Sequence, residues 1–125
     1  MTAAQPLVLI VEDNPDQRDL LRRNFERSGC TVVLAESAED AIVAYRRSGP
    51  DLAVIDLILP GMDGATLIAR LREERPDCAI VVTSVLDPAA FPDSDDVLPK
   101  PFTRAHVERV LESCLGSGRT VEQHG

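Results

Sequence analysis

Short runs of apolar residues alternate along this 125-residue chain with segments whose apolar residues recur every three or four positions. Runs of this kind are typical of strands buried on both faces, and the longer period is typical of amphipathic helices. The runs occupy residues 7–11, 31–35, 52–56 and 79–83. Alternation of strands and helices specifies a parallel sheet with helices on both faces. We therefore predict an α/β fold with its chemistry at the carboxyl ends of the strands.

Capping and helix-breaking residues bound the expected helices. Asn14-Pro15 suits the start of the first helix and Gly29 its end. The other signals are Ser37 and Gly49-Pro50 for the second helix, Ala65 and Pro76 for the third, and Thr103 and Gly116 for the last. We therefore expect one domain over residues 6–116, followed by a flexible polar tail over residues 117–125.

Composition and charge exclude several classes of protein. The net charge of −8 argues against nucleic acid as a partner, since phosphates select basic surfaces. No run approaches the roughly 18 apolar residues of a membrane span, and the N-terminus lacks the pattern of a secretory signal. Cys30, Cys78 and Cys114 fit neither a disulfide framework nor a zinc site, which favours reduced thiols. These features predict a cytoplasmic protein.

Charged and hydroxyl side chains stand where the expected strands end. Glu12 and Asp13 follow the first strand, Asp56 ends the third, and Thr83 ends the fourth. Lys100, the only lysine in the chain, ends a fifth strand just before the last helix. The carboxyl ends of parallel strands share one edge, so we expect these side chains to converge.

Three converging carboxylates need a cation. Two like charges about 4 Å apart cost on the order of 4 kcal/mol at an effective dielectric near 20. An all-oxygen cluster of this kind suits Mg²⁺, and a lysine ammonium suits a phosphoryl oxygen. A carboxylate can itself accept a phosphoryl group. Taken singly, each residue is more often a cap, a loop acid or a surface charge, but the joint arrangement favours a phosphoryl site.

The chain resembles the receiver domain of two-component response regulators. The matching segments are Val8–Asn14, Asp56–Gly64, Ile80–Ser84 and Lys100–Phe102. The resemblance implies a flavodoxin-like (βα)5 receiver fold with a parallel sheet in the order 2-1-3-4-5. It also implies phosphorylation by a sensor histidine kinase or a histidine phosphotransfer protein. A receiver assists its own phosphotransfer and dephosphorylation without being an enzyme that acts on other substrates.

The resemblance also assigns roles to individual residues. Asp56 matches the phosphoacceptor, Thr83 the switch hydroxyl and Lys100 the active-site lysine. Glu12, Asp13 and Asp56 match the Mg²⁺ ligands, together with the backbone carbonyl of Ile58. In the family, the side chains at Ile58 and Val85 flank the path of the attacking water. Both are apolar here, so we expect slow autodephosphorylation.

The segment between Thr83 and Lys100 departs from the family pattern. It is too short for a full helix and a strand, and Pro88 and Pro92 interrupt it. We predict that the fourth helix of the family is absent, or reduced to a stub over residues 88–91. Val97 stands where receivers usually carry an aromatic residue. The surface that receivers commonly use for signalling must therefore be remodelled.

Several alternatives remain open. The favoured hypothesis is a receiver that signals by contact with a downstream protein partner and has no DNA-binding domain of its own, although the chain could be part of a longer regulator. A degenerate receiver that acts without phosphorylation is the main alternative. An aspartate-nucleophile phosphatase would need an acid at position 58, where Ile58 stands. A flavodoxin would need a phosphate-binding first loop, which Glu12 and Asp13 would repel.

Overall fold

The computed structural model describes residues 5–59, 61–84, 95–100 and 102–124, with backbone alone at 84, 99 and 116–124. Strands and helices alternate through this part of the chain. They are β1 (Leu7–Val11), α1 (Pro15–Arg27), β2 (Thr31–Ala35), α2 (Ala38–Ser48), β3 (Leu52–Asp56), α3 (Gly64–Glu74), β4 (Ala79–Ser84), β5 (Asp96–Pro99) and α4 (Arg104–His124). The predicted strands are confirmed, and the fourth extends one residue further, to Ser84.

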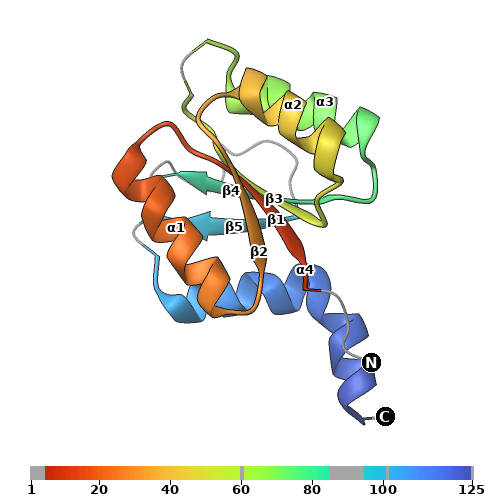
Figure 1. Cartoon of the computed structure of the whole chain (residues 1–125). Coiled ribbons are helices and arrows are strands. Elements are labelled where there is room, and N and C mark those ends of the chain that lie inside the picture. The colour runs from red at the N-terminus through yellow and green to blue at the C-terminus, as the bar shows by residue number, and fades with distance from the viewer. Residues whose placement is uncertain (1–4, 60, 85–94, 101, 125) are drawn as a thin grey trace.

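All five strands are parallel and form one sheet in the order β2-β1-β3-β4-β5. Helices α1 and α4 cover one face of the sheet, and α2 and α3 cover the other (Figure 1). The predicted α/β class and strand order are thus confirmed. Among the described residues, no helix is long and apolar enough to cross a membrane.

Alternate residues of the same strand serve two separate cores. In β1, Leu9 and Val11 pack with the inner side chains of α2 and α3, whereas Val8 and Ile10 pack with those of α1 and α4. Every residue of β3 is buried, as the continuous apolar run predicts. Burial on both faces fixes the strand register, because a slip of one residue would exchange the two faces.

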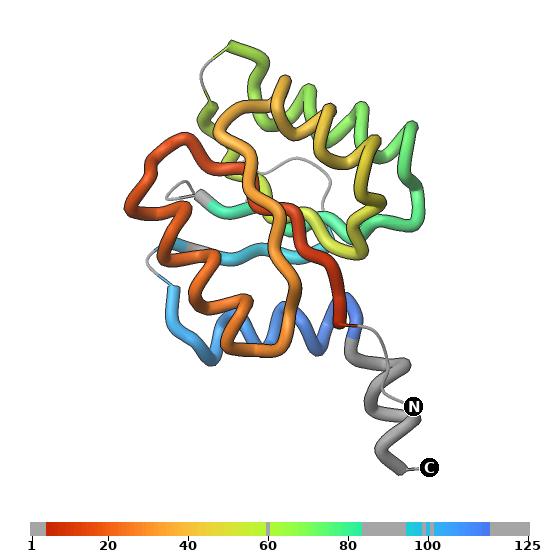
Figure 2. The backbone as a smooth tube through the Cα atoms, viewed as in Figure 1, coloured from red at the N-terminus to blue at the C-terminus, as the bar shows by residue number. Residues whose placement is uncertain are grey.

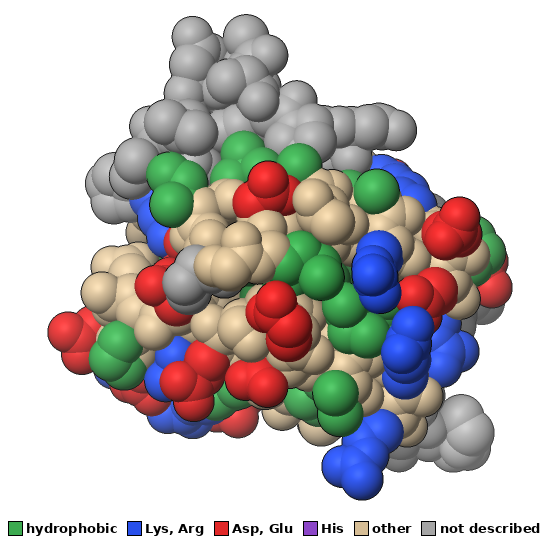
Figure 3. Space-filling model, turned by 90° about the horizontal axis from the view of Figure 1, so that it is seen from above, with side chains coloured by type: hydrophobic (Ala, Val, Ile, Leu, Met, Phe, Trp, Pro, Cys, Tyr) green, Lys and Arg blue, Asp and Glu red, His purple; other side chains and the backbone are tan. Residues whose placement is uncertain are grey.

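Side-chain caps fix where the helices begin. Asn14 accepts hydrogen bonds from the amides of Asp16 and Gln17, and the Ser37 hydroxyl accepts one from Asp40. Asp63 caps α3 in the same way, although the sequence had suggested only an approximate start for that helix. Basic side chains gather toward one end of the face seen in Figure 3. Arg46 and Arg47 lie in the last turn of α2. This arrangement complements the helix dipole.

The C-terminal helix is longer than the sequence predicted. We expected it to end near Gly116, but α4 continues to His124. Glycine costs about 1 kcal/mol in a helix relative to alanine without forbidding it, and no proline follows to stop the helix. The helix end was therefore placed too early.

Between β4 and β5, the described part of the chain contains no helix. The stub predicted over residues 88–91 lies outside the described residues.

Candidate functional site

The predicted site residues meet at the carboxyl edge of the sheet. The pairing of β1 with β3 aligns Val11 with Ile55, so the next residues, Glu12 and Asp56, lie at the same level at the ends of the two strands. The pairing of β3 with β4 aligns Asp56 directly with Thr83. The chain leaves β1 and β5 on the same side of the sheet (Figure 2). Parallel register thus brings together residues that are far apart in the sequence.

Three carboxylates cluster at this edge. Glu12, Asp13 and Asp56 each offer an oxygen atom, and these atoms all lie within 4.8 Å of one another. Glu12 and Asp56 are buried, with exposed fractions of 1% and 7%, whereas Asp13 is exposed. All three donors are hard oxygen ligands of the kind that Mg²⁺ prefers. The cluster could therefore hold a metal ion.

Lys100 supplies the positive charge within this cluster. Its Nζ atom lies 2.8 Å from Oε1 of Glu12 and 3.0 Å from Oδ2 of Asp56. Burial lowers the pKa of Lys100, but the hydrogen bonds to Glu12 and Asp56 outweigh it, so the pKa is raised overall. The lysine is therefore a firmly charged bridge between two buried acids.

Burial is the main influence on the Glu12 carboxyl. It raises the pKa of Glu12, against the lowering effect of hydrogen bonds from Lys100 and from the Asn14 amide. The Asn14 nitrogen donates to Oε2 of Glu12 at 3.2 Å. Both carboxyl oxygens of Glu12 are thus held in place.

Asp56 has one further hydrogen bond, and the hydroxyl group of the neighbouring Thr83 has none among the described residues. Oδ1 of Asp56 accepts a hydrogen bond of 3.0 Å from the Ile58 amide. The hydroxyl of Thr83 is fully buried, yet it has no hydrogen-bond partner among the described residues. An unpaired buried hydroxyl costs about 1–3 kcal/mol, so its presence beside Asp56 suggests a group that completes the site.

An open cleft lies over the cluster. It has a volume of about 420 Å³ and is lined by Glu12, Asp13, Asn14, Gln17, Asp56, Ile58 and Lys100. The side chain of Ile58 stands at its mouth, 60% exposed. Asn14 and Gln17 had not been expected in the site, although their position just after the acidic pair could have indicated them.

Gly64 is a second residue whose role the sequence did not reveal. A Cβ atom at this position would lie 2.6 Å from the carbonyl oxygen of Asp56 and 2.8 Å from Cα of Leu57. The Gly64 amide also donates to the Leu57 carbonyl at 3.2 Å. Helix α3 therefore begins in direct contact with the backbone that follows Asp56, and only glycine allows this approach.

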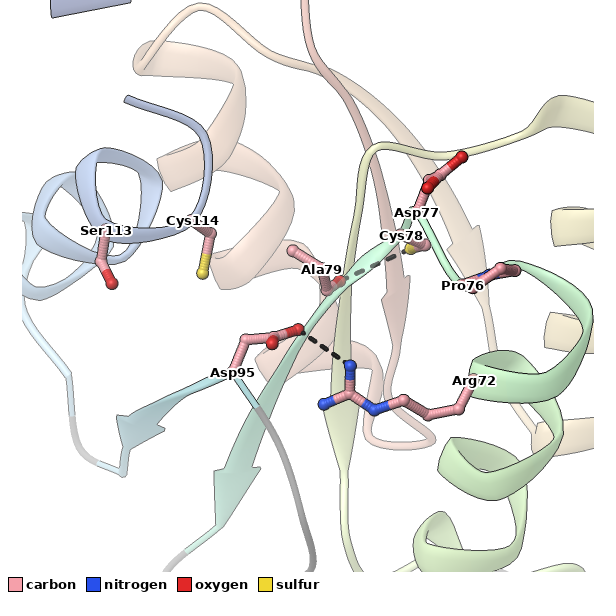
Figure 4. A pocket seen from close by; sticks show the side chains of 8 residues that line it. All are labelled: Arg72, Pro76, Asp77, Cys78, Ala79, Asp95, Ser113 and Cys114. Carbon is pink, nitrogen blue, oxygen red and sulfur yellow. Dashed lines mark hydrogen bonds and ion pairs between the residues drawn. The ribbon is translucent and has the colours of Figure 1, made fainter. Parts of the chain in front are cut away.

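Another cavity, of about 330 Å³, lies at the opposite edge of the sheet and is lined by Arg72, Cys78, Asp95 and Cys114 among others (Figure 4). Arg72 points across it to Asp95, whose carboxylate also accepts a hydrogen bond from the Ile80 amide. Burial raises the pKa of Cys78 to about 12 and that of Cys114 to about 11. Thiols that stay protonated are poor nucleophiles and metal ligands, so this cavity is the weaker candidate.

The fold is an open parallel α/β domain with a cluster of three carboxylates that could hold a metal ion at the carboxyl ends of its strands. The chain matches the response regulator receiver domain family over residues 8–112. It therefore belongs to this family, whose members work in two-component signalling systems.

Known relatives agree with this assignment. The chain is 46% identical over 72 residues to an uncharacterized 14.6 kDa protein of Leptolyngbya boryana, covering 58% of this chain and 55% of the relative. It is 31% identical over 118 residues to the transcriptional activator protein PfeR of Pseudomonas aeruginosa, covering 88% and 38%. The chain thus spans about half or less of these relatives.

A solved structure of another receiver domain is similar in fold. The receiver domain of a sensor histidine kinase from Pseudomonas aeruginosa has a TM-score of 0.83 and 27% identity, with 91% of this chain and all of that chain covered. That structure holds a magnesium ion coordinated in its active-site cleft.

We predict that Gly64→Ala destabilises the domain by about 1–3 kcal/mol, the usual cost of forcing extra atoms into a packed region. The added methyl group would have to displace the backbone at Asp56 and Leu57. Urea denaturation measures the free energy of unfolding. Gly49→Ala is a useful comparison, since nothing lies within 4 Å there and only its positive φ opposes the change. A Gly64→Ala variant as stable as the wild type would contradict the close packing.

We also predict that Lys100→Met lowers the free energy of unfolding by about 3 kcal/mol at neutral pH without metal, because it leaves two buried acids unpaired. Without the ammonium, the pKa of Glu12 would rise further above its ordinary value of 4.5. A carboxyl that holds its proton more tightly when folded loses stability as pH rises. The deficit should therefore shrink as pH is lowered toward 4.5. Lys100→Arg, which keeps the charge, should lose less. A deficit that grows in acid would refute this account.

Proposed function

We propose that this chain is a phosphoryl-accepting receiver in which Asp56 takes the phosphoryl group from a phosphohistidine. The donor would be a sensor histidine kinase or a histidine phosphotransfer protein. The observation that carries the proposal is the joint arrangement around Asp56: two further carboxylates, a bridging ammonium and a buried hydroxyl without a partner. No other cluster among the described residues combines these groups.

In the transfer step, a carboxylate oxygen of Asp56 attacks the phosphorus atom of the phosphohistidine. The new oxygen–phosphorus bond forms as the phosphorus–nitrogen bond breaks, and the imidazole nitrogen keeps the electron pair. The product is an acyl phosphate on Asp56 and a free histidine on the donor. Such a reaction depends on positioning and on neutralising charge.

The residues present fit Mg²⁺. Glu12, Asp13 and Asp56 would hold it with the backbone carbonyl of Ile58, since all four ligands are oxygen atoms. When bound, the cation would neutralise negative charge on the phosphoryl oxygens. Glu12 is suited to act as a ligand of this cation because both of its carboxylate oxygens are already held in place.

Lys100 and Thr83 would serve the phosphoryl group from the protein side. Lys100 already lies 3.0 Å from Asp56, so a small movement would let its ammonium donate a hydrogen bond to a phosphoryl oxygen instead. The Thr83 hydroxyl, which lacks a partner among the described residues, can donate to another oxygen. Both contacts would tie β4 and β5 to the phosphorylation state of β3.

The output would be contact with a downstream protein partner rather than DNA binding by this domain. The net charge of −8 fits that expectation. The location that we propose for the chain is the cytoplasm. A phosphatase is the less suitable alternative, because Ile58 cannot act as an acid. A receiver that signals without phosphorylation remains the competing hypothesis.

Incubation of the full chain with a small phosphodonor and Mg²⁺ should add the mass of one phosphoryl group, as measured by intact mass spectrometry. Asp56→Asn should abolish the gain, because an amide cannot form the acyl phosphate. Asp51→Asn is a matched control on the opposite edge of the sheet. If the wild-type chain gains no mass while folded and in excess Mg²⁺, the phosphorylation-independent alternative is favoured.

We predict that the phosphorylated chain loses its phosphoryl group slowly, because the exposed side chain of Ile58 cannot orient the attacking water. Val85, the other residue expected beside that path, lies outside the described residues. Ile58→Gln should speed hydrolysis, by roughly tenfold if one oriented water is gained. The decay of the phosphorylated mass with time measures the rate. A lifetime of seconds for the wild type at neutral pH would contradict the prediction.

A further inference from the structure

The turn between β1 and α1 is held by an arginine that lies outside the acidic cluster. One guanidinium nitrogen of Arg18, Nη1, donates to the carbonyl oxygen of Glu12 at 3.0 Å and to that of Asp13 at 3.3 Å. The Arg18 amide donates to the Asn14 carbonyl at 2.9 Å and so closes the first turn of α1. Arg18 thus contacts three successive peptide groups of this turn.

The two acids of the turn depend on this contact to different degrees. Glu12 has several other restraints: its amide donates to the Ala35 carbonyl at 3.0 Å, and its carboxylate bonds with Asn14 and Lys100. The carboxylate of Asp13 is exposed and has no hydrogen bond or ion pair within the described parts of the chain. Arg18 holds the carbonyl of the peptide group that follows Asp13, and the Asn14 amide of the same peptide group bonds to Glu12, so these two contacts restrain the orientation of Asp13.

We propose that Arg18 is a positioning residue for the metal site. It fixes the peptide groups on either side of Asp13 and so keeps that carboxylate within 4.8 Å of those of Glu12 and Asp56. This inference rests on the proposed function, because it assumes that the three carboxylates hold Mg²⁺.

Arginine suits this task for two reasons. Each terminal guanidinium nitrogen carries two N–H groups, so one nitrogen can donate to two carbonyls, and the charge on the donor strengthens both hydrogen bonds. The rigid guanidinium also reaches the turn from the first turn of the helix with little loss of rotamer freedom per bond. Because the contacts are to carbonyls, the carboxylates stay free to bind a metal.

Isothermal titration of the full-length, metal-free chain with Mg²⁺ tests the proposal. Arg18→Met keeps the aliphatic stem and removes both bonds, and we expect the affinity to fall by roughly tenfold, as for other residues that orient metal ligands. Arg18→Lys keeps the charge and should recover part of the affinity.

The matched control is Arg22→Met, one turn further along α1. Arg22 pairs with the side chains of Asp19 and Glu26 and makes no described contact with the turn, so its loss should leave the Mg²⁺ affinity unchanged. If Arg18→Met only weakened the helix, both variants would lower thermal stability and neither would change the affinity. An Arg18→Met affinity equal to that of the wild type would overturn the proposal.

A second readout separates this inference from the proposed function. Amide hydrogen exchange of the metal-free chain should be faster at Asp13 and Asn14 in both Arg18 variants, and unchanged in Arg22→Met. Unchanged exchange in Arg18→Met would overturn the positioning role of Arg18 whether or not metal binds. Failure of the wild-type chain to bind Mg²⁺ would instead overturn the proposed metal site. If Arg18→Met does not fold, Arg18→Lys still decides the outcome, because an ammonium cannot reproduce the planar donor group.

Discussion

The attraction between Lys100 and the two buried acids, Glu12 and Asp56, is the interaction on which this edge of the domain depends. Like charges this close repel each other, and a cation between them offsets that repulsion. The ammonium supplies that cation from β5, the edge strand, and thereby links the end of β5 to the ends of β1 and β3. One ion-pair network therefore makes the site possible and also holds three strands together. A metal entering the cleft would add a second cation and reduce the dependence of the acids on Lys100.

The sheet can present such a site because a separate hydrophobic core packs against each of its two faces. Alternate residues of each central strand pack against α1 and α4 on one face and against α2 and α3 on the other. Neither face can shift register without exposing apolar side chains, so the strand ends stay level with one another. The alignment of Asp56 with Thr83 follows from packing several residues away. Packing in the middle of the sheet thus fixes the positions of the residues at the ends of its strands.

Much of this could be predicted from the sequence because the signals are local. Apolar runs predicted the strands, caps such as Asn14 and Ser37 predicted helix starts, and the acids at the strand ends predicted the cluster. Gly64 and Arg18 were missed because their roles depend on distance in space: one lies against the backbone after Asp56, and the other reaches back to the carbonyls before its helix. The end of α4 was misplaced because glycine weakens a helix without ending it. The assignment of individual roles to the site residues remains a proposal that the experiments above can decide.

The unpaired hydroxyl of Thr83 has a consequence for switching if Asp56 is phosphorylated. In the unphosphorylated domain this buried hydroxyl has no hydrogen-bond partner among the described residues, so any conformation that supplies one is stabilised. A hydrogen bond to a charged oxygen contributes about 1.5–3 kcal/mol, which shifts a two-state ratio by roughly ten- to a hundredfold. Complete inversion of a population from 1:99 to 99:1 requires about 5.5 kcal/mol. Thr83 alone would therefore bias the domain without committing it, and the rest of the driving force would have to come from Lys100 or from a bound partner. In such a domain, phosphorylation would change the ratio of the two conformations only in part, and the final ratio would depend on the bound partner.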